Sequence, residues 1–520
     1  NAGTLTTNST ANFTGTVTNT RTFNSKGISN LSANFTNSGA TSVLNLNNDF
    51  KLAGNWSNAG TFNPNNKAVF FNGATGGQSI TNTNSGTETF AYLVNDKAAG
   101  TLTISSNIII SGTAGDVLQL INSGSTSLAG SRSITFTGNG GNILVSGAQR
   151  TIVGSGSNAL ININGTKTVR SLSGGSLVLG ANITTKLANG MNFGAGLTTI
   201  SHILEINANG FVNTNAPIYG SVSTLTYNTG AAYGVSNEWT GNSTTAGAGV
   251  PQNVVITGNT IVNMPNSIRG LAGNLTINAL SSLNMNNTIG ADLALGGNFT
   301  NSGTFTPNNT AVIFNGEDTT QTITGATTFD YFVVNKTGTL GSVTLASSII
   351  VNKDLTLINR CIVTGANNLT LPNKTSVITY NANSYVNTTS TGKLVRLGID
   401  GTSDWVFPVG VNALVRYTPI TLKNLSGTTD IQVSASTTIT KAAAVPANAL
   451  LAEWRVTSSS AVTANVRTDW TSTENNSVNT SGPGDLCVYN STVGSNYTLY
   501  DVTLSTYNTE ATNVSLVNTG

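Results

Sequence analysis

The feature that most constrains this chain is a phrase of twenty residues that occurs twice. Residues 54–73 read GNWSNAGTFNPNNKAVFFNG, and residues 297–316 read GNFTNSGTFTPNNTAVIFNG. The copies align without a gap at an offset of 297 − 54 = 243 residues, and the alignment resumes after a four-residue deletion. The aligned pairs include Trp56 and Phe299, Phe71 and Phe314, Gln78 and Gln321, Phe90 and Phe329, and Lys97 and Lys336. Two copies in one chain indicate a repeated structural unit.

Shorter echoes of the same phrase recur about every twenty residues near the start of the chain. NFT begins at Asn12, NFTNSG at Asn34 and NWSNAG at Asn55, so the starts are 34 − 12 = 22 and 55 − 34 = 21 residues apart. A repeat of this length is typical of the coils of solenoid proteins. Alternating apolar runs, such as residues 43–46 and 160–163, favour short strands that bury one face.

The composition favours strands over helices. Charged residues make up only 8% of the chain, and Glu, Lys, Arg and Met are scarce, whereas Thr, Val, Ile and aromatic residues are common. We therefore expect an all-β fold, with a right-handed parallel β-helix, or β-solenoid, over residues 1–391. Asn and Gly suit the corners of such coils because they tolerate positive φ. Asn side chains stacked from coil to coil would form an amide ladder along the axis.

The pattern changes near Gly392. The later phrases are DWVFPVG from Asp404, RYTPITL from Arg416 and EWRVT from Glu453. They indicate longer strands separated by loops rich in turn residues, which is typical of antiparallel sandwiches. We predict a β-sandwich-like module over residues 392–520.

Two sets of phrases carry a family resemblance. TYNTG from Thr226, NEW from Asn237 and PQNVVI from Pro251 precede GNLTI from Gly273 and the second long copy. This order resembles the repetitive stalk regions of very large secreted surface proteins of Bacteroidetes that are exported by the type IX secretion system. The sandwich phrases are similar to a module that commonly follows such stalks. The resemblance implies an extracellular, cell-surface repeat protein. The sequence starts at Asn1 without an initiator Met or a charged and apolar leader, so we expect this chain to be a mature or excised part of a longer product.

Catalytic constellations are scarce in the sequence. Glycoside cleavage needs two placed carboxylates, and a metal-assisted lyase needs several. The chain has 20 Asp and Glu residues, and their only adjacent pair, Glu317-Asp318, falls in a predicted turn. The single histidine, His202, lies in an apolar strand run without a nucleophile motif nearby. We expect no enzyme activity, no cofactor and no metal; a polysaccharide lyase or hydrolase on a β-helix is the alternative.

Aromatic residues offer a second alternative, a glycan-binding adhesin. Sugars stack on exposed rings, and Trp239, Tyr227 and Tyr233 lie in a stretch that resembles an insertion. These three residues are the candidate ligand-binding site. In contrast, Trp56 is repeated as Phe299, and Trp405 and Trp454 lie in strand-like phrases, so we expect these three tryptophans in the core.

Other features limit the partners. A net charge of +2 gives no basis for binding nucleic acid, and no apolar run reaches the ~20 residues of a membrane helix. Cys361 and Cys487 are flanked by apolar residues, which favours two buried thiols over a single bridge.

The sequence thus predicts a non-enzymatic structural or adhesive protein, a rigid β-solenoid segment of a cell-surface fibre or adhesin. Its expected partners are other copies of itself, which would form a homo-oligomer, other segments of the same surface protein, and cell-surface glycans.

Overall fold

The computed structural model describes most of the chain. The described residues are 1–156, 158–388, 390–411, 416–437, 450, 452–470, 482–489, 497–504 and 508–516, and the side chains of 482–489 and 497–504 are excepted. Within these ranges every element of regular secondary structure is a β-strand, and no helix capable of crossing a membrane is found. The all-β prediction is confirmed. The chain divides into two compact units, Asn1–Val262 and Asn263–Gly520.

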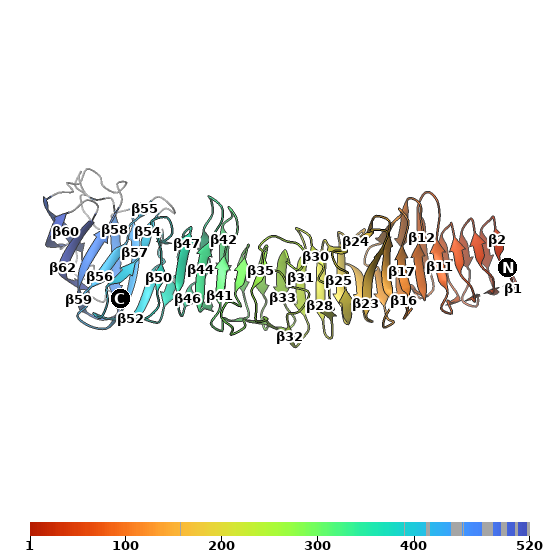
Figure 1. Cartoon of the computed structure of the whole chain (residues 1–520), viewed down its shortest axis with the longest axis horizontal. Helices are drawn as coiled ribbons and strands as arrows, with labels where there is room; N and C mark the ends of the chain where they lie inside the picture. The colour runs from red at the N-terminus through yellow and green to blue at the C-terminus, as the bar shows by residue number, and fades with distance from the viewer. Residues whose placement is uncertain are drawn as a thin grey trace. The chain divides into compact units, whose positions relative to one another are not determined.

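The first unit is a parallel β-solenoid whose sheets are built from every third strand, except that β31 (Thr224–Asn228) pairs with β33 (Asn253–Ile256) (Figure 1). Each strand therefore pairs with its equivalents one coil earlier and one coil later, as the fold prediction requires. One sheet of ten strands consists of β3 (Val17–Asn19), β6 (Phe35–Asn37), β9 (Trp56–Asn58), β12 (Gln78–Asn82), β15 (Thr101–Ile104), β18 (Ser125–Leu128), β21 (Gln149–Gly154), β24 (Ser176–Leu179), β27 (Thr198–Ile200) and β30 (Ile218–Tyr219).

The coils of the first unit vary in length. Val17 is in register with Phe35, a spacing of 35 − 17 = 18 residues, and Leu225 is in register with Val254, a spacing of 254 − 225 = 29 residues. The extra residues lie in the corners, because the paired strands remain two to six residues long. The twenty-residue period of the sequence therefore describes the first coils better than the later ones.

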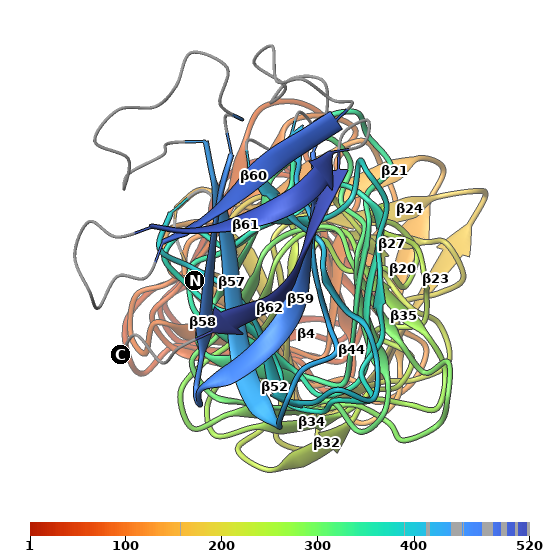
Figure 2. The ribbon, with the colours of Figure 1, turned by 90° about the vertical axis from the view of Figure 1, so that its left-hand side faces the viewer.

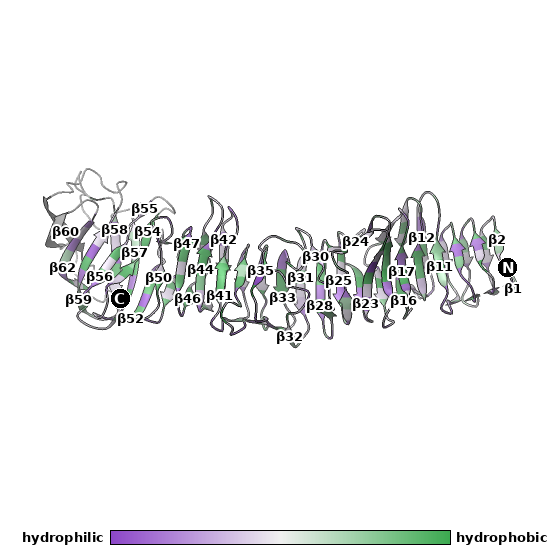
Figure 3. Cartoon of the chain, viewed as in Figure 1, coloured by the Kyte–Doolittle hydropathy of each residue, from purple (hydrophilic) through white to green (hydrophobic). Residues whose placement is uncertain are grey.

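Burial follows the alternation of apolar and polar residues along each strand. In β11 (Ala68–Phe71), Val69 and Phe71 are buried, while Ala68 and Phe70 are partly exposed. Figure 3 shows the same alternation as green and purple bands within the arrows. Since successive side chains of a strand point to opposite faces, one face of every coil fills the interior.

The two copies of the long phrase build the same aromatic cluster, once in each unit. In the first copy, ring centroids lie 4.9 Å apart for Trp56 and Phe62 and 5.6 Å apart for Trp56 and Phe90. In the second, the distances are 5.4 Å for Phe299 and Phe305 and 5.5 Å for Phe299 and Phe329. The repeat seen in the sequence is thus a repeat of core packing.

An amide ladder runs along the axis of the first coils, as predicted, but it lies in the interior and not at the corners. Asn19 Nδ2 donates to Asn37 Oδ1 at 2.7 Å, and Asn37 Nδ2 donates to Asn58 Oδ1 at 2.9 Å. Asn58 Nδ2 in turn donates to Oε2 of Glu88, in β13 (Thr87–Phe90), at 2.8 Å. All four side chains are at most 3% exposed, so the ladder satisfies amide groups that water cannot reach.

A buried, hydrogen-bonded pair of Gln and Lys occurs in both copies. Gln78 Nε2 donates to the carbonyl oxygens of Leu52 and Gly54, and Lys97 Nζ donates to Gln78 Oε1 at 3.2 Å. In the second copy Gln321 donates to the carbonyls of the equivalent residues, and Lys336 Nζ donates to Gln321 Oε1 at 3.0 Å. The matched Gln and Lys positions of the repeat therefore fasten a strand to the preceding coil.

Asparagine occupies many of the corners, as predicted. In the described part of the chain, ten of the fifteen non-glycine residues with positive φ are asparagines. Asn65 and Asn66 in the first copy have φ of 48° and 57°, and Asn308 and Asn309 in the second have 48° and 65°. The PNN phrase thus encodes one turn that both copies share.

The second unit begins with further parallel coils. One of its sheets has the order β35 (Arg269–Leu271), β38 (Leu293–Leu295), β41 (Ala311–Phe314), β44 (Tyr331–Asn335), β47 (Leu355–Asn359) and β50 (Ile378–Thr379). Cys361 is buried here, and its Sγ lies 3.8 Å from the carbonyl oxygen of Asn383. The side chain of Cys487 lies outside the described residues, so the prediction of two buried thiols stays open for it.

The second unit then changes from parallel to antiparallel pairing at β52 (Leu394–Ile399). This strand pairs in parallel with β49 (Leu369–Leu371) and antiparallel with β57 (Thr429–Ser436). Figure 2 shows β57 beside β58 (Glu453–Ser458), and β59 (Val462–Asp469) beside β62 (Asn508–Leu516). The predicted C-terminal antiparallel module is present, although parallel pairing also continues from β51 (Val386–Asn387) to β54 (Val409–Val411). The strand β52 therefore belongs to both architectures.

Candidate functional site

The three aromatic residues predicted to bind a ligand lie close together but largely inside the first unit. Tyr227, in β31 (Thr224–Asn228), and Trp239 are fully buried, and Tyr233, in β32 (Ala232–Gly234), is partly buried. The rings of Tyr227 and Tyr233 lie 5.5 Å apart at an angle of 46°. A sugar cannot stack on the faces of Tyr227 or Trp239 in this arrangement, because no ring face of either residue reaches the surface.

These tyrosines instead surround a carboxylate that the sequence analysis did not single out, Glu238. Tyr227 and Tyr233 donate their hydroxyls to its two carboxylate oxygens at 3.1 and 3.2 Å, and the hydroxyl of Tyr219 donates to its backbone carbonyl at 2.8 Å. The backbone N–H of Ser236 adds a fourth hydrogen bond at 2.9 Å. Glu238 is 0% exposed, so this cluster ties the 232–240 segment to the coils beneath it.

Burial sets the titration of this cluster. It raises the pKa of the Glu238 carboxyl above its ordinary value of 4.5, against the hydrogen bonds that lower it. Burial also raises the pKa of Tyr219 and Tyr227 well above 10, so both hydroxyls are neutral donors at physiological pH. Because Glu238 is fully buried and held by four hydrogen bonds, the cluster holds a loop in place.

The adjacent acidic pair lies in an exposed turn, as predicted. Glu317 and Asp318 are both exposed, and Asp318 Oδ1 accepts a hydrogen bond from the backbone N–H of Leu340 at 2.8 Å. Within the described ranges, no group of three or more His, Cys, Asp and Glu side chains is placed to hold a metal ion.

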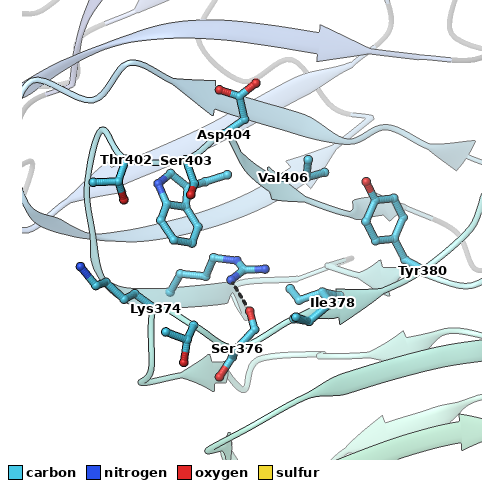
Figure 4. Close-up of a pocket in the computed structure, with 12 residues that line it drawn as sticks. Lys374, Ser376, Ile378, Tyr380, Thr402, Ser403, Asp404 and Val406 are labelled. Carbon is cyan, nitrogen blue, oxygen red and sulfur yellow. Dashed lines mark hydrogen bonds between the residues drawn. The ribbon is translucent and has the colours of Figure 1, made fainter.

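A polar groove in the second unit is the best candidate for a site. Its first hollow has a volume of about 430 Å³ and lies between the segment 374–380, the strand β52 and the segment 402–406 (Figure 4). A second hollow of about 560 Å³ shares Lys374 with the first and is lined mainly by polar side chains: Asn309, Asp330, Asn352, Lys353 and Asn373. We refer to the two hollows together as the groove.

Arg396, on β52, lines the first hollow and is only 6% exposed. Its Nη1 donates to the carbonyl oxygen of Ser376 at 3.1 Å, and its guanidinium carbon lies 5.6 Å from the ring centre of Trp405. Its Nε is buried without a hydrogen-bond partner. Burial lowers the pKa of Arg396 to about 10, which leaves the side chain charged at neutral pH.

The other cation of the first hollow, Lys374, is already paired. Its Nζ donates to Asp400 Oδ2 at 3.0 Å, and Asp400 also accepts hydrogen bonds from the backbone and hydroxyl of Thr402. These hydrogen bonds, that of the Thr402 hydroxyl first, lower the pKa of Asp400 to about 2. Asp404 points its carboxylate away from Ser376 and Lys374 in Figure 4. The charge of Lys374 is thus neutralised by Asp400, whereas the charge of Arg396 is not.

The tryptophans expected in the core behave in two ways. Trp56 is fully buried and Trp405 is 8% exposed, whereas Trp454 is partly exposed and donates its indole N–H to the carbonyl of Thr418 at 2.8 Å.

Sequence reasoning missed Arg396 as a site residue. One feature of the sequence could have pointed to Arg396: it is a cation between apolar residues, Leu394-Val395-Arg396-Leu397, in a phrase that otherwise indicates a buried strand.

The fold and the groove define a class of protein, a parallel β-solenoid that ends in an antiparallel module. Comparisons with known proteins do not narrow this class: no family model matches the chain, and no match was found among curated proteins or solved structures.

Proposed function

We propose that this chain is a non-enzymatic structural segment of an extracellular protein, a rigid β-solenoid spacer in a cell-surface fibre or adhesin. The observation that carries the proposal is the parallel pairing of every third strand over successive coils within each unit. In such a ladder each inner strand is hydrogen-bonded on both edges, and equivalent strands are about 4.8 Å apart along the axis.

The interior supports stiffness. Bending a coil stack would separate side chains that contact their counterparts one coil away, such as Phe35 and Trp56, whose ring centroids are 5.2 Å apart. It would also break buried amide bonds such as that between Asn37 and Asn58. Because each coil contacts mainly its neighbours, stability adds along the stack, which suits a protein whose task is to span distance.

Self-association and surface location are parts of the same proposal. With 8% charged residues and a net charge of +2, two copies meet little electrostatic repulsion, so side-by-side assembly is favoured. The resemblance to stalk regions of secreted surface proteins supports a place outside the cell, and other copies or other segments of the same surface protein are the proposed partners.

Two measurements on the native protein test this function. Antibodies raised against residues 1–262 are expected to label intact producing cells. Stretching single molecules between their ends is expected to give a stiff response before unfolding, followed by a series of similar unfolding steps. Labelling only after cell lysis, or extension at low force like that of a flexible linker, would contradict the proposal.

A further inference from the structure

Arg396 differs from three arginines that form ion pairs. Arg170, Arg455 and Arg467 pair with carboxylates although their side chains are 42%, 49% and 41% exposed. Arg396, the more deeply buried side chain, has no carboxylate partner among the described residues. A buried guanidinium without an anion is costly, because desolvation of its charge is not offset by a close opposite charge.

The unpaired part of this guanidinium is one of its edges. Nη1 is bonded to Ser376, whereas neither Nε nor Nη2 has a hydrogen-bond partner in the described structure. Nε is sealed from solvent, so Nη2 is the nitrogen of this edge that an anion in the hollow can reach. Stacking of the guanidinium against Trp405 fixes its plane.

The walls around this edge suit a ligand that carries many hydroxyl groups. Thr375, Thr402 and Ser403 are exposed at the first hollow, where Figure 4 shows Thr402 and Ser403. The second hollow adds the amides of Asn309, Asn352 and Asn373, and Lys374 lines both hollows. The first hollow is also lined by the apolar side chains of Val377, Ile378 and Val406. Mixed walls of this kind suit a chain of sugar units, whose rings carry both hydroxyl groups and apolar C–H faces, better than a single small anion.

We propose that the groove binds an acidic saccharide chain, whose carboxylate pairs with Nη2 of Arg396. The neighbouring sugar units lie along the second hollow and exchange hydrogen bonds with its amide side chains. The proposal is independent of the spacer function, because a stiff segment needs no ligand and a ligand site needs no stiffness.

Calorimetric titration of the full chain with three short probes tests the site: trigalacturonate, neutral maltotriose, and acetate. Trigalacturonate is expected to bind at least tenfold more tightly than either of the others, and added NaCl is expected to weaken its binding. Equal binding of maltotriose would overturn the role of the carboxylate. Binding of acetate as tight as that of the trisaccharide would reduce the groove to a small-anion site and overturn the saccharide assignment.

Three variants locate the interaction. Arg396→Gln removes the proposed partner, and Ser403→Trp fills the first hollow from an exposed position while leaving Arg396 in place. Both are expected to weaken trigalacturonate binding at least tenfold. Arg360→Gln is the matched control, since Arg360 also donates to a backbone carbonyl, that of Gly338, and lies outside the groove; its affinity should stay within twofold. If Ser403→Trp keeps the wild-type circular dichroism and full affinity, the proposal is wrong, whether or not Arg396→Gln folds.

Discussion

The indole N–H of Trp56 donates to Oε2 of Glu88 at 2.9 Å, and both side chains are buried in the first unit. At the equivalent positions of the second unit stand Phe299 and Thr327, which lack both the donor and the carboxylate. Asn301, the counterpart of Asn58, donates to the hydroxyl of Thr327 at 3.1 Å. An indole N–H buried without an acceptor is destabilising. The first copy therefore combines Trp56 with the acceptor Glu88, whereas the second combines Phe299, which needs no acceptor, with Thr327.

This pairing predicts that the two positions are coupled. Glu88→Thr alone is expected to destabilise the first unit by about 1–3 kcal/mol for the indole N–H left without an acceptor. Adding Trp56→Phe should recover part of this loss, because the double variant reproduces the pair of the second unit. Urea unfolding of the wild type, both single variants and the double variant measures the coupling energy. Strict additivity of the two effects would contradict the account.

The buried amide ladder predicts a different cost for two similar asparagines. Asn37→Ala leaves the amide of Asn19 and the Oδ1 of Asn58 without their ladder partner, so a loss of about 1–3 kcal/mol is expected. Asn30 also bonds an asparagine one coil away, Asn12, but this pair is exposed. Asn30→Ala is therefore the control, and its effect should stay within about 0.5 kcal/mol because water replaces the lost bond. Equal losses of stability for Asn37→Ala and Asn30→Ala in thermal unfolding would show that the contribution of the ladder does not depend on its burial.

Glu238 predicts a pH dependence of the first unit. Its folded pKa is raised above the ordinary 4.5, so the folded state holds this proton more tightly than the unfolded state does. The stabilisation is therefore complete below pH 4.5 and is lost as the pH rises through the folded pKa. Glu238→Gln keeps an acceptor for Tyr227 without a charge, and it should reduce the fall in the free energy of unfolding between pH 4.5 and 8.

The control for this experiment is Glu317→Gln, an exposed carboxylate in the second unit. It should leave the pH profile unchanged. A Glu238→Gln variant with the wild-type profile would show that the carboxyl of Glu238 does not titrate differently in the folded and unfolded chains.

Much of the fold could be predicted from the sequence, because the relevant signals are local or repeated. The positions of Trp56 and Phe299 in the repeat identify equivalent core sites, and the many asparagines predict an amide ladder, although not that Asn37 and Asn58 build it inside the coils. The groove could not be predicted in this way. The groove brings together Arg396, Lys374 and Trp405 at the point where β52 passes from parallel to antiparallel pairing. The repeat pattern of the sequence does not indicate that these residues are close in space.

The sequence analysis expected an exposed ring at Trp239, but the ring is buried. The cause is again a set of contacts between segments that are distant in sequence. An insertion-like stretch rich in aromatic residues suggests a surface loop, but the buried carboxyl of Glu238 gathers Tyr219, Tyr227 and Tyr233 around it. Hydrogen bonds between residues of different coils decided the exposure of these rings, and the sequence does not show such contacts.

The coils stack in register, so equivalent coils of the two copies should be interchangeable. Deleting residues 54–296 joins Ala53 directly to Gly297 and places the second copy on the coil that normally carries the first. Asn37 would then meet Asn301 in place of Asn58, and Phe35 would meet Phe299 in place of Trp56. A deletion of residues 54–286 removes ten residues fewer and is the out-of-phase control.

Electron microscopy of the purified deletion variants, with their thermal unfolding, tests this claim most directly. The in-phase variant is expected to be soluble, to unfold cooperatively and to form particles shorter than the wild type, while the out-of-phase variant aggregates. If both deletions fail alike, or if the in-phase particles are no shorter, the coils are not interchangeable units and the solenoid spacer account is wrong.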